Sequence, residues 1–350
     1  MKKILFTGGG SAGHVIPNIA LMEQVLSAGI ADVCYMGTNG IEKRLISDWK
    51  IPFYQIDCPK LIRGRNWDSF RANLRIPMQF HYAKKQAMEG LNTCRPDLVF
   101  SKGGYVALPV VFAAKSLGIP CFAHESDFSL GLANRLSVGK CDCLFTSFPE
   151  TAANIKKAKY SGAPIRRSVL SATKAEARKK FGIPFHEKVI LIFGGGSGSE
   201  TINEAVRKHL KTLTETYCVL HIRGKGNLTK CNVKNYRQFE FITDMGMAYA
   251  CSDLIISRAG AGAVFEILAL KKPSILIPLE GQTRGDQQEN ADYFSQKGLC
   301  VTLSQSNLHR LPSCIDETLQ NKTLQQRLNE SDYGQGNEII LREIKKRLRI

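Results

Sequence analysis

The stretch IISRAGAGAVFEILALKKPSILIPLEGQTRGDQQENA, residues 255–291, decides the fold class because it holds two strand–loop–helix units in succession. An apolar run ends at Ile256, and the small residues that follow, up to Gly262, let a ligand approach the backbone. We expect a helix over residues 263–270, a second buried strand over residues 273–278 and another helix beginning near Gln287. Strands and helices that alternate in this way predict a parallel sheet, and such sheets bind ligands beyond the carboxyl ends of their strands.

The length and composition of the chain indicate two domains of similar size. The chain has 350 residues, of which 43% are hydrophobic, and this is enough for two cores. Its formal net charge of +17 favours an anionic partner, such as nucleic acid, a phosphate-bearing metabolite or an acidic membrane surface. Both halves of the chain share the positive charge and no nucleic-acid recognition motif occurs, so we expect no nucleic-acid partner.

The cysteines and the apolar runs indicate a reduced cytoplasmic protein. The eleven cysteines are scattered, and Cys141 and Cys143 form the only close pair, so no metal site built from spaced thiolates is expected. The glycines at residues 8–10 interrupt the first apolar run too early for a signal peptide. No run in the sequence approaches the roughly 18 apolar residues of a membrane span.

Strand and helix patterns alternate along the whole chain. Buried strands are predicted over residues 2–7, 32–36, 97–100, 120–123, 142–146, 188–193, 217–222, 254–257, 274–278 and 299–303. Helices are predicted over residues 16–26, 69–90, 108–117, 130–137 and 338–350. We expect a first domain over residues 1–160, a second over residues 161–335 and a C-terminal helix over residues 336–350.

A glycine loop between a strand and a helix occurs twice, at residues 8–14 and 194–199, which suggests two similarly wound domains. In the first loop the spacing Gly8-x-Gly10-x-x-Gly13 matches the dinucleotide fingerprint, so a nicotinamide-dependent oxidoreductase is one alternative. The next predicted strand ends in Gly-Thr-Asn at residues 37–39, without the acidic residue of that fingerprint, and this argues against it. His14, at the start of the helix, is either a structural cap or a group that acts in the chemistry.

Two polar loops follow predicted strands in the first half of the chain. One is Ser-Lys-Gly-Gly-Tyr at residues 101–105, and the other is His-Glu-Ser-Asp at residues 124–127. Glu125 and Asp127 either solvate their loop or bind a ligand. A histidine and a carboxylate side by side, His124 and Glu125, can also orient a sugar or serve in acid–base catalysis.

Six motifs, taken in chain order, resemble those of the MurG-type glycosyltransferases. They are GGGSAGHVIPNIAL (residues 8–21), SKGGYVALP (101–109), HES (124–126), GAPIR (162–166), GGGSGS (194–199) and the stretch 255–291. The resemblance covers nearly the whole chain. It implies an α/β protein of the GT-B fold, with two Rossmann-like, doubly wound parallel-sheet domains and a cleft between them. The first domain then binds the acceptor and faces the membrane, and the second binds the UDP-sugar.

The resemblance also implies the reaction. Enzymes of this family transfer N-acetylglucosamine from UDP-N-acetylglucosamine to the muramyl sugar of lipid I, the undecaprenyl-linked acceptor, and form lipid II in peptidoglycan synthesis. A glycosyltransferase of the same superfamily that uses diacylglycerol as acceptor is the alternative. The implied location is the cytoplasmic face of the cell membrane, with the protein bound peripherally. No metal and no other cofactor are expected.

Site residues are implied where this sequence matches the family's motifs. The implied donor contacts are Ser11, Ala12, Gly13, Asp127, Arg166, Gly195, Gly196, Ser197, Ile242, Arg258, Glu266, Asp286 and Gln287, and the implied acceptor contacts are Gly103, Gly104, Tyr105 and Asn134. Among these, Glu266 corresponds to the carboxylate that holds the ribose hydroxyls, and Gln287 to a glutamine that contacts the donor sugar. Two positions depart from the family: Ser126-Asp127 replaces glutamine and asparagine of many members, and Gly196 replaces a serine.

Inverting transfer requires a base for the acceptor hydroxyl and electrostatic stabilisation of the departing UDP. Helix N-termini behind the glycine loops, together with Arg166, can stabilise UDP without a metal. For the base, His14 is the first candidate, and Glu125 or His124 is the second.

The window of residues 60–85 predicts contact with an anionic membrane surface. It contains the cations Lys60, Arg63, Arg65, Arg71, Arg75, Lys84 and Lys85 against Asp68 alone, and the apolar residues Trp67, Phe70, Leu74, Ile76, Met78, Phe80 and Tyr82. Cations among interfacial side chains favour anionic lipid. The alternative is an ordinary amphipathic helix over residues 69–90, in which several of these apolar side chains belong to the core. The basic helix at residues 338–350 is expected to pack on the protein.

Overall fold

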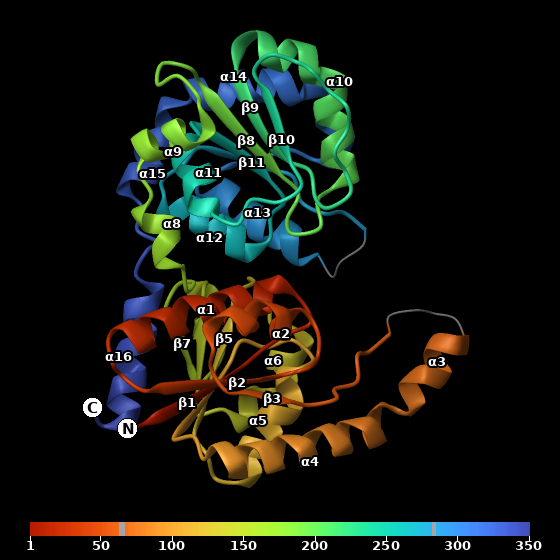
Figure 1. The fold of residues 1–350 in the computed structure, drawn as a ribbon, viewed down its shortest axis with the longest axis vertical. Helices are drawn as coiled ribbons and strands as arrows, with labels where there is room; N and C mark the ends of the chain where they lie inside the picture. The colour runs from red at the N-terminus through yellow and green to blue at the C-terminus, as the bar shows by residue number, and fades with distance from the viewer. Residues whose placement is uncertain (63–66, 282–284) are drawn as a thin grey trace. The chain divides into compact units, whose positions relative to one another are not determined.

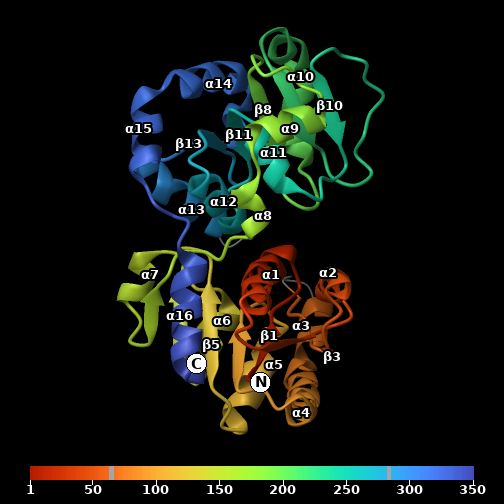
Figure 2. The ribbon, with the colours of Figure 1, turned by 60° about the vertical axis from the view of Figure 1, so that its left-hand side comes forward.

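The computed structural model describes residues 1–62, 67–281 and 285–350, and it divides into two compact units (Figure 1; Figure 2). The first unit consists of Met1–Arg166 and Gln335–Ile350, and the second of Arg167–Gly334. The division thus falls a few residues after the predicted boundary at residue 160. The C-terminal helix, predicted as a separate segment, belongs to the first unit.

The first unit is built on a parallel sheet with the strand order β3-β2-β1-β4-β5-β6-β7. Its strands are β1 (Lys3–Thr7), β2 (Asp32–Gly37), β3 (Phe53–Gln55), β4 (Leu98–Ser101), β5 (Cys121–Glu125), β6 (Cys143–Thr146) and β7 (Ala158–Tyr160). Its helices are α1 (Ala12–Ser27), α2 (Ile41–Ile46), η1 (Ser47–Trp49), α3 (Trp67–Leu74), α4 (Ile76–Cys94), α5 (Ala107–Ser116), α6 (Leu132–Ser137), η2 (Val138–Lys140), α7 (Pro149–Ala153) and α16 (Gly336–Leu348). The order reverses direction between β1 and β4, which places a ligand crevice at their carboxyl ends.

Alternate residues of the central strands fill two cores. Ile4 and Phe6 of β1 pack with α1 and with α16, whose apolar residues Ile340 and Ile344 are fully buried. Leu5, between them, points to the opposite face and packs with α4 and α5. Figure 2 shows that α16 lies alongside this sheet, although the helix is far from the strands in the sequence. Burial on both faces explains why these strands read as continuous apolar runs rather than alternating ones.

The predicted helix over residues 69–90 is two helices, α3 and α4, which meet at Arg75. Pro77 lies in the first turn of α4. In one continuous helix its ring would clash with the carbonyl four residues earlier, so the chain restarts the helix there. Figure 1 shows α3 standing away from the sheet at the end of α4.

The second unit repeats the same winding with the strand order β10-β9-β8-β11-β12-β13. Its strands are β8 (Val189–Phe193), β9 (Cys218–Ile222), β10 (Tyr236–Phe239), β11 (Leu254–Ser257), β12 (Ser274–Leu276) and β13 (Val301–Thr302). Its helices are α8 (Arg167–Ser171), α9 (Lys174–Phe181), α10 (Glu200–Thr216), α11 (Met245–Cys251), α12 (Ala261–Ala269), α13 (Asp286–Gln296), η3 (Gln305–Arg310), α14 (Leu311–Gln320) and α15 (Lys322–Glu330). Ile190 and Ile192 pack with α10 and α14 on one face. Here the reversal of order lies between β8 and β11.

Three strands that the sequence patterns did not predict, β3, β7 and β10, lie at sheet edges. Each has only three or four residues, most of them half-buried or exposed. Edge strands are covered on fewer sides, so they lack the apolar run on which the prediction depended. None of the helices described is long and apolar enough to cross a membrane.

Candidate active site

The candidate site of the first unit lies at the carboxyl ends of β1, β4 and β5. The glycine loop after β1 faces the loop after β4: a Cβ atom on Gly10 would collide with the ring of Tyr105, and one on Gly104 would collide with the carbonyl oxygen of Gly9. Both glycines also have positive φ, +81° and +77°, which other residues rarely adopt. Only glycine therefore allows these two loops to approach each other so closely.

Glu42, the second residue of α2, fixes the first glycine loop and was not predicted as a site residue. Its side chain is fully buried. The carboxylate accepts hydrogen bonds from the N–H of Gly10 at 3.3 Å, from the N–H of Thr38 at 2.8 Å and from the Thr38 hydroxyl. The dinucleotide fingerprint requires an acidic residue where β2 ends; here the acid comes later, on α2, and serves the loop itself.

His14 lies half-buried in the first turn of α1, where the two glycine loops meet. Its Nδ1 is 2.9 Å from the Oγ of Ser11, and a Cβ on Gly104 would be 3.0 Å from the same nitrogen. When Nδ1–H donates to Ser11, Nε2 carries the lone pair that a general base requires. This geometry suits His14 for proton transfer, while the role itself stays a prediction.

The two alternative bases, His124 and Glu125, have structural contacts instead. His124 is fully buried, and its Nε2 donates to the carbonyl oxygen of Gly162 at 3.0 Å. Burial, with a smaller effect of Lys102, holds the pKa of His124 well below its ordinary value, so the ring is neutral. The Glu125 carboxylate accepts from the N–H groups of Ser126 (2.9 Å), Asp127 (3.1 Å) and Gly131 (2.8 Å) and from Asn134 Nδ2 (2.9 Å). Through these four hydrogen bonds Glu125 organises the loop after β5.

Most of the remaining predicted residues of this unit lie near the carboxyl ends of the same strands. Asn134 is buried and also donates to the carbonyl oxygen of His124 at 3.2 Å, and its Oδ1 would be 3.0 Å from a Cβ on Gly103. Tyr105 is half-buried, and burial raises the pKa of its phenol. Ser11, Ala12 and Gly13 form the start of α1, and Asp127 lies in the loop after β5. Arg166, predicted as a donor contact, ends the first unit and is half-buried.

The second unit offers a phosphate-sized loop at the carboxyl end of β8. Gly195, Gly196 and Ser197 are exposed, and the loop leads into α10, whose first residue is Glu200. Ser199 caps the helix, with its Oγ accepting from the N–H of Ile202 at 3.4 Å. Unpaired N–H groups at the start of a helix and in a glycine loop attract phosphate oxygens. The observed geometry thus suits the predicted diphosphate contact.

Arg258, predicted as a contact near the nucleotide base, is mostly occupied by the protein. It is 8% exposed, and its guanidinium donates to the carbonyl oxygens of Ile277 (3.1 Å) and Pro278 (3.0 Å), to Ser199 Oγ (2.7 Å) and to Gln305 Oε1 (3.0 Å). Burial lowers the pKa of Arg258. These bonds join the ends of β11 and β12 to the phosphate loop, so Arg258 braces the site from behind.

The other predicted donor residues are spread over two helices and a loop. Glu266, half-buried on α12, accepts a hydrogen bond from the Tyr249 hydroxyl at 3.0 Å. Gln287, half-buried on α13, accepts from the N–H of Leu279 at 3.1 Å. Ile242 is buried in the loop before α11, and Asp286 is the first residue of α13. Within residues 255–291, β12 and α13 thus begin within one residue of the predicted starts of the second strand and of the helix near Gln287.

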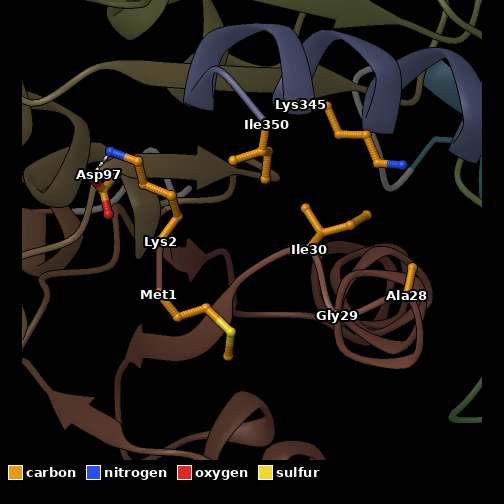
Figure 3. Close-up of a pocket in the computed structure, with 8 residues that line it drawn as sticks. All are labelled: Met1, Lys2, Ala28, Gly29, Ile30, Asp97, Lys345 and Ile350. Carbon is orange, nitrogen blue, oxygen red and sulfur yellow. Dashed lines mark hydrogen bonds and ion pairs between the residues drawn. The ribbon is translucent and has the colours of Figure 1, made fainter.

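In the described part of the first unit, a large hollow lies away from the site and a smaller one adjoins it. A hollow of about 800 Å³ is lined by Met1, Lys2, Ala28, Gly29, Ile30, Asp97, Lys345 and Ile350, and Figure 3 shows Lys2 paired with Asp97 at its edge. Most of the residues that line it come just before β1, β2 or β4 in the sequence. This hollow therefore lies at the amino ends of these strands, whereas parallel sheets bind substrates at the carboxyl ends. A smaller hollow of about 340 Å³ is lined by Thr38, Asp57, Cys58, Pro59, Gln79, Tyr82 and Tyr105. This smaller hollow extends from Tyr105, in the loop after β4, to α4.

Within the ranges that the structure covers, no group of three or more histidine, cysteine, aspartate or glutamate side chains is placed to hold a metal ion. The expectation of a reaction without a metal or other cofactor stays a prediction.

The two-unit architecture and the paired glycine loops are those of a GT-B glycosyltransferase. The model of the glycosyltransferase family 28 N-terminal domain matches residues 4–146, and that of the family 28 C-terminal domain matches residues 189–346. The chain belongs to this family, in its MurG-type group.

Named relatives and one solved structure agree with this assignment. The chain is 40% identical over 98% of both chains to a protein of Clostridium perfringens (strain SM101 / Type A) named UDP-N-acetylglucosamine–N-acetylmuramyl-(pentapeptide) pyrophosphoryl-undecaprenol N-acetylglucosamine transferase. It is 41% identical to a protein of the same name from Clostridium botulinum (strain Langeland / NCTC 10281 / Type F), over 94% of this chain and 90% of the relative. The crystal structure of Acinetobacter baumannii MurG matches with a TM-score of 0.76 and 25% identity, over 99% of this chain and 100% of that one.

Proposed function

We propose that this glycosyltransferase transfers N-acetylglucosamine from UDP-N-acetylglucosamine to the muramyl sugar of lipid I, forming lipid II. The observation that supports it most is the 40% identity, over 98% of both chains, to a transferase named for this reaction. Each of the six motifs on which the resemblance depends includes residues at or just after the carboxyl end of a strand, where parallel sheets bind substrates. No observation favours diacylglycerol as acceptor.

In the proposed mechanism His14 acts as general base. Ser11 holds Nδ1, and Nε2 takes the proton of the attacking hydroxyl of the muramyl sugar. The hydroxyl oxygen forms a bond to C1 of N-acetylglucosamine as the bond from C1 to the UDP oxygen breaks. Because attack and departure occur on opposite faces of the sugar, the configuration at C1 is inverted.

The second unit binds the donor in this proposal. Gly195, Gly196 and Ser197, with the N-terminus of α10, hold the diphosphate and stabilise the negative charge that develops on departing UDP. Glu266 accepts hydrogen bonds from the ribose hydroxyls, and Tyr249 orients its carboxylate. Gln287 contacts the sugar, and Ile242 lies at the nucleotide base. Arg166 adds a positive charge near UDP.

The first unit binds the acceptor. Gly103 and Gly104 form the loop after β4, where Gly104 lies against His14, and Tyr105 borders the smaller hollow. Asn134 and Glu125 hold the shape of this loop region through their shared hydrogen bond. Asp127, in the loop after β5, stays a proposed contact of the donor.

The segment formed by α3 and α4 is the proposed membrane contact, and the cytoplasmic face of the membrane is the proposed location. Five of its seven predicted apolar residues are exposed: Trp67 (69%), Phe70 (54%), Leu74 (63%), Met78 (60%) and Tyr82 (61%). The other two, Ile76 and Phe80, are half-buried, and Phe80 packs edge-on against Phe112. Exposed cations accompany them at Lys60, Arg71, Arg75 and Lys85, whereas Arg63 and Arg65 lie outside the described residues.

Such a patch suits a peripheral enzyme because the acceptor's lipid cannot leave the bilayer cheaply. Cations near anionic lipid contribute about 1 kcal/mol each to binding. The smaller hollow extends from Tyr105 to Tyr82 on α4, so it connects the acceptor loop to this patch.

A transfer assay tests the proposed function. Labelled N-acetylglucosamine in its UDP form is offered with a short-chain lipid I analogue, and in parallel with diacylglycerol in detergent. We expect label on the lipid I analogue alone. Label on diacylglycerol alone would replace the proposed acceptor by the alternative one, and label on neither would overturn the proposal.

A further inference from the structure

Lys102, the first residue after β4, carries a buried cation that the mechanism above does not use. Its side chain is 2% exposed. Its N–H donates to the carbonyl oxygen of Thr7 at 2.8 Å, at the end of β1, and its Nζ donates to Ser126 Oγ at 2.7 Å, in the loop after β5. A Cβ on Gly8 would be 3.0 Å from Lys102 Cβ. The lysine thus lies directly behind the first glycine loop.

A buried ammonium with so few partners is costly to keep. It has three N–H donors, and Ser126 Oγ is the one hydrogen-bond acceptor found for it among the described residues. Burial lowers the pKa of Lys102, and the carboxylates of Glu125 and Asp127 oppose this by favouring the charged form. Groups kept in such surroundings are characteristic of functional sites, because an apolar residue of similar size would stabilise the fold as well or better.

The charges around Lys102 indicate what it does. Glu125 and Asp127 place two carboxylates at the carboxyl end of β5. Without Lys102, these two carboxylates and that of Glu42, which binds the first glycine loop, would repel an anion that approached the loops after β1 and β4. Because Lys102 is buried, water screens its positive charge poorly. The charge therefore acts over several ångströms and offsets the repulsion that the carboxylates exert on an anion.

We propose that Lys102 is a positioning residue whose fixed charge, held by Ser126, allows the acceptor's diphosphate to bind at the glycine loops of the first unit. The inference rests on the proposed function, because it takes the acceptor to be a diphosphate-linked lipid. Ser126 fits this role, because its short hydroxyl side chain accepts from the lysine at 2.7 Å. Lys102 and Ser126 therefore act as a pair.

Calorimetry with two soluble, short-chain ligands tests this inference. One is the diphosphate-linked muramyl acceptor, and the other is a matched analogue with an uncharged link. Lys102→Met removes the charge and keeps the length of the side chain. We expect it to weaken binding of the diphosphate ligand at least about tenfold, from the loss of one nearby poorly screened charge, and to change binding of the uncharged analogue less than about twofold.

A second variant keeps the lysine. Ser126→Asp places a carboxylate against the ammonium and neutralises it, and we expect the same selective loss; this variant decides the matter if Lys102→Met does not fold. Lys115→Met, which removes an exposed cation in the last turn of α5, should leave both affinities unchanged. Equal loss for both ligands, or no loss for either, would show that Lys102 is purely structural. Transfer by the parent enzyme is measured separately, so failure of the proposed function is distinguishable.

Discussion

His14 and Glu125 lie at the same sheet edge, yet their contacts assign them different roles. His14 is half-buried, and its Nδ1 lies within hydrogen-bond distance of the Ser11 hydroxyl. Glu125 is 5% exposed and accepts four hydrogen bonds, three of them from loop N–H groups. Replacement of the first should therefore affect the reaction, and replacement of the second should affect the fold.

For His14→Ala we expect kcat to fall by about 10²–10⁴, the usual contribution of a general base, with little change in the KM for the donor. Steady-state kinetics with both substrates varied provide the measurement. A fall of less than about fivefold in kcat would make His14 a structural cap.

Glu125→Ala should lower the free energy of unfolding by about 3 kcal/mol, because the buried amide of Asn134 and three half-buried loop N–H groups lose a charged acceptor. Urea unfolding of the variant and of His14→Ala measures the difference. The histidine variant, whose half-buried ring does not bind a set of loop N–H groups as Glu125 does, should unfold within about 1 kcal/mol of the parent. Equal stability of Glu125→Ala and the parent would contradict the assigned role.

Glu266→Ala should weaken UDP binding more than tenfold, because two charge-assisted hydrogen bonds to the ribose are each worth roughly 1.5–3 kcal/mol. Tyr249→Phe, which removes only the hydroxyl that orients Glu266, should have a smaller effect. Calorimetry with UDP measures both. Unchanged affinity in folded Glu266→Ala would exclude the ribose contact.

At the scale of elements, α3 and α4 present apolar side chains that a helix of a water-exposed surface would not need. Trp67→Ser with Leu74→Ser and Met78→Ser should reduce sedimentation with anionic vesicles at least tenfold, because each side chain loses burial worth about 1.5–3 kcal/mol in the interface. UDP affinity should not change. Phe185→Ser in the second unit removes a side chain of similar exposure, 67%, and serves as the control.

The membrane hypothesis fails if the triple variant and the parent sediment equally. In that case the basic helix α16 is not the obvious replacement, because Ile340, Ile344 and Leu348 pack it into the first core.

The sequence predicted the central strands and the loops that follow them, because both depend on local patterns. Apolar runs buried on both faces identified β1, β4, β5, β8 and β11, and glycines marked the loops after β1 and β8. Glu42 could not be found in this way, because its carboxylate reaches a loop 32 positions away. The same holds for Lys102 and Ser126, which are 24 positions apart. Contacts between distant loops follow from strand order, which local patterns do not reveal.

At the scale of the whole molecule, each unit contains a buried neutral histidine. Burial lowers the pKa of His221 from 6.5 to about 3, and that of His124 well below its ordinary value. The unfolded chain therefore binds more protons than the native one below pH 6.5, so stability is full above that pH and falls as the pH drops toward about 3.

For His221 the loss at pH 5 is about 2 kcal/mol relative to pH 7. Urea unfolding at the two pH values measures it. His221→Asn should show a smaller pH dependence than the parent, and an identical dependence would contradict the assignment to His221.

In the proposed reaction an acceptor hydroxyl that His14 deprotonates displaces UDP directly. The anomeric configuration of the transferred sugar tests this most directly, since a single displacement inverts the α-linked donor. Proton NMR of the isolated product should show N-acetylglucosamine attached to the muramyl sugar in the β configuration, by a large coupling constant of its anomeric proton. An α-linked product would contradict the account, because it requires two displacements or a different geometry of attack.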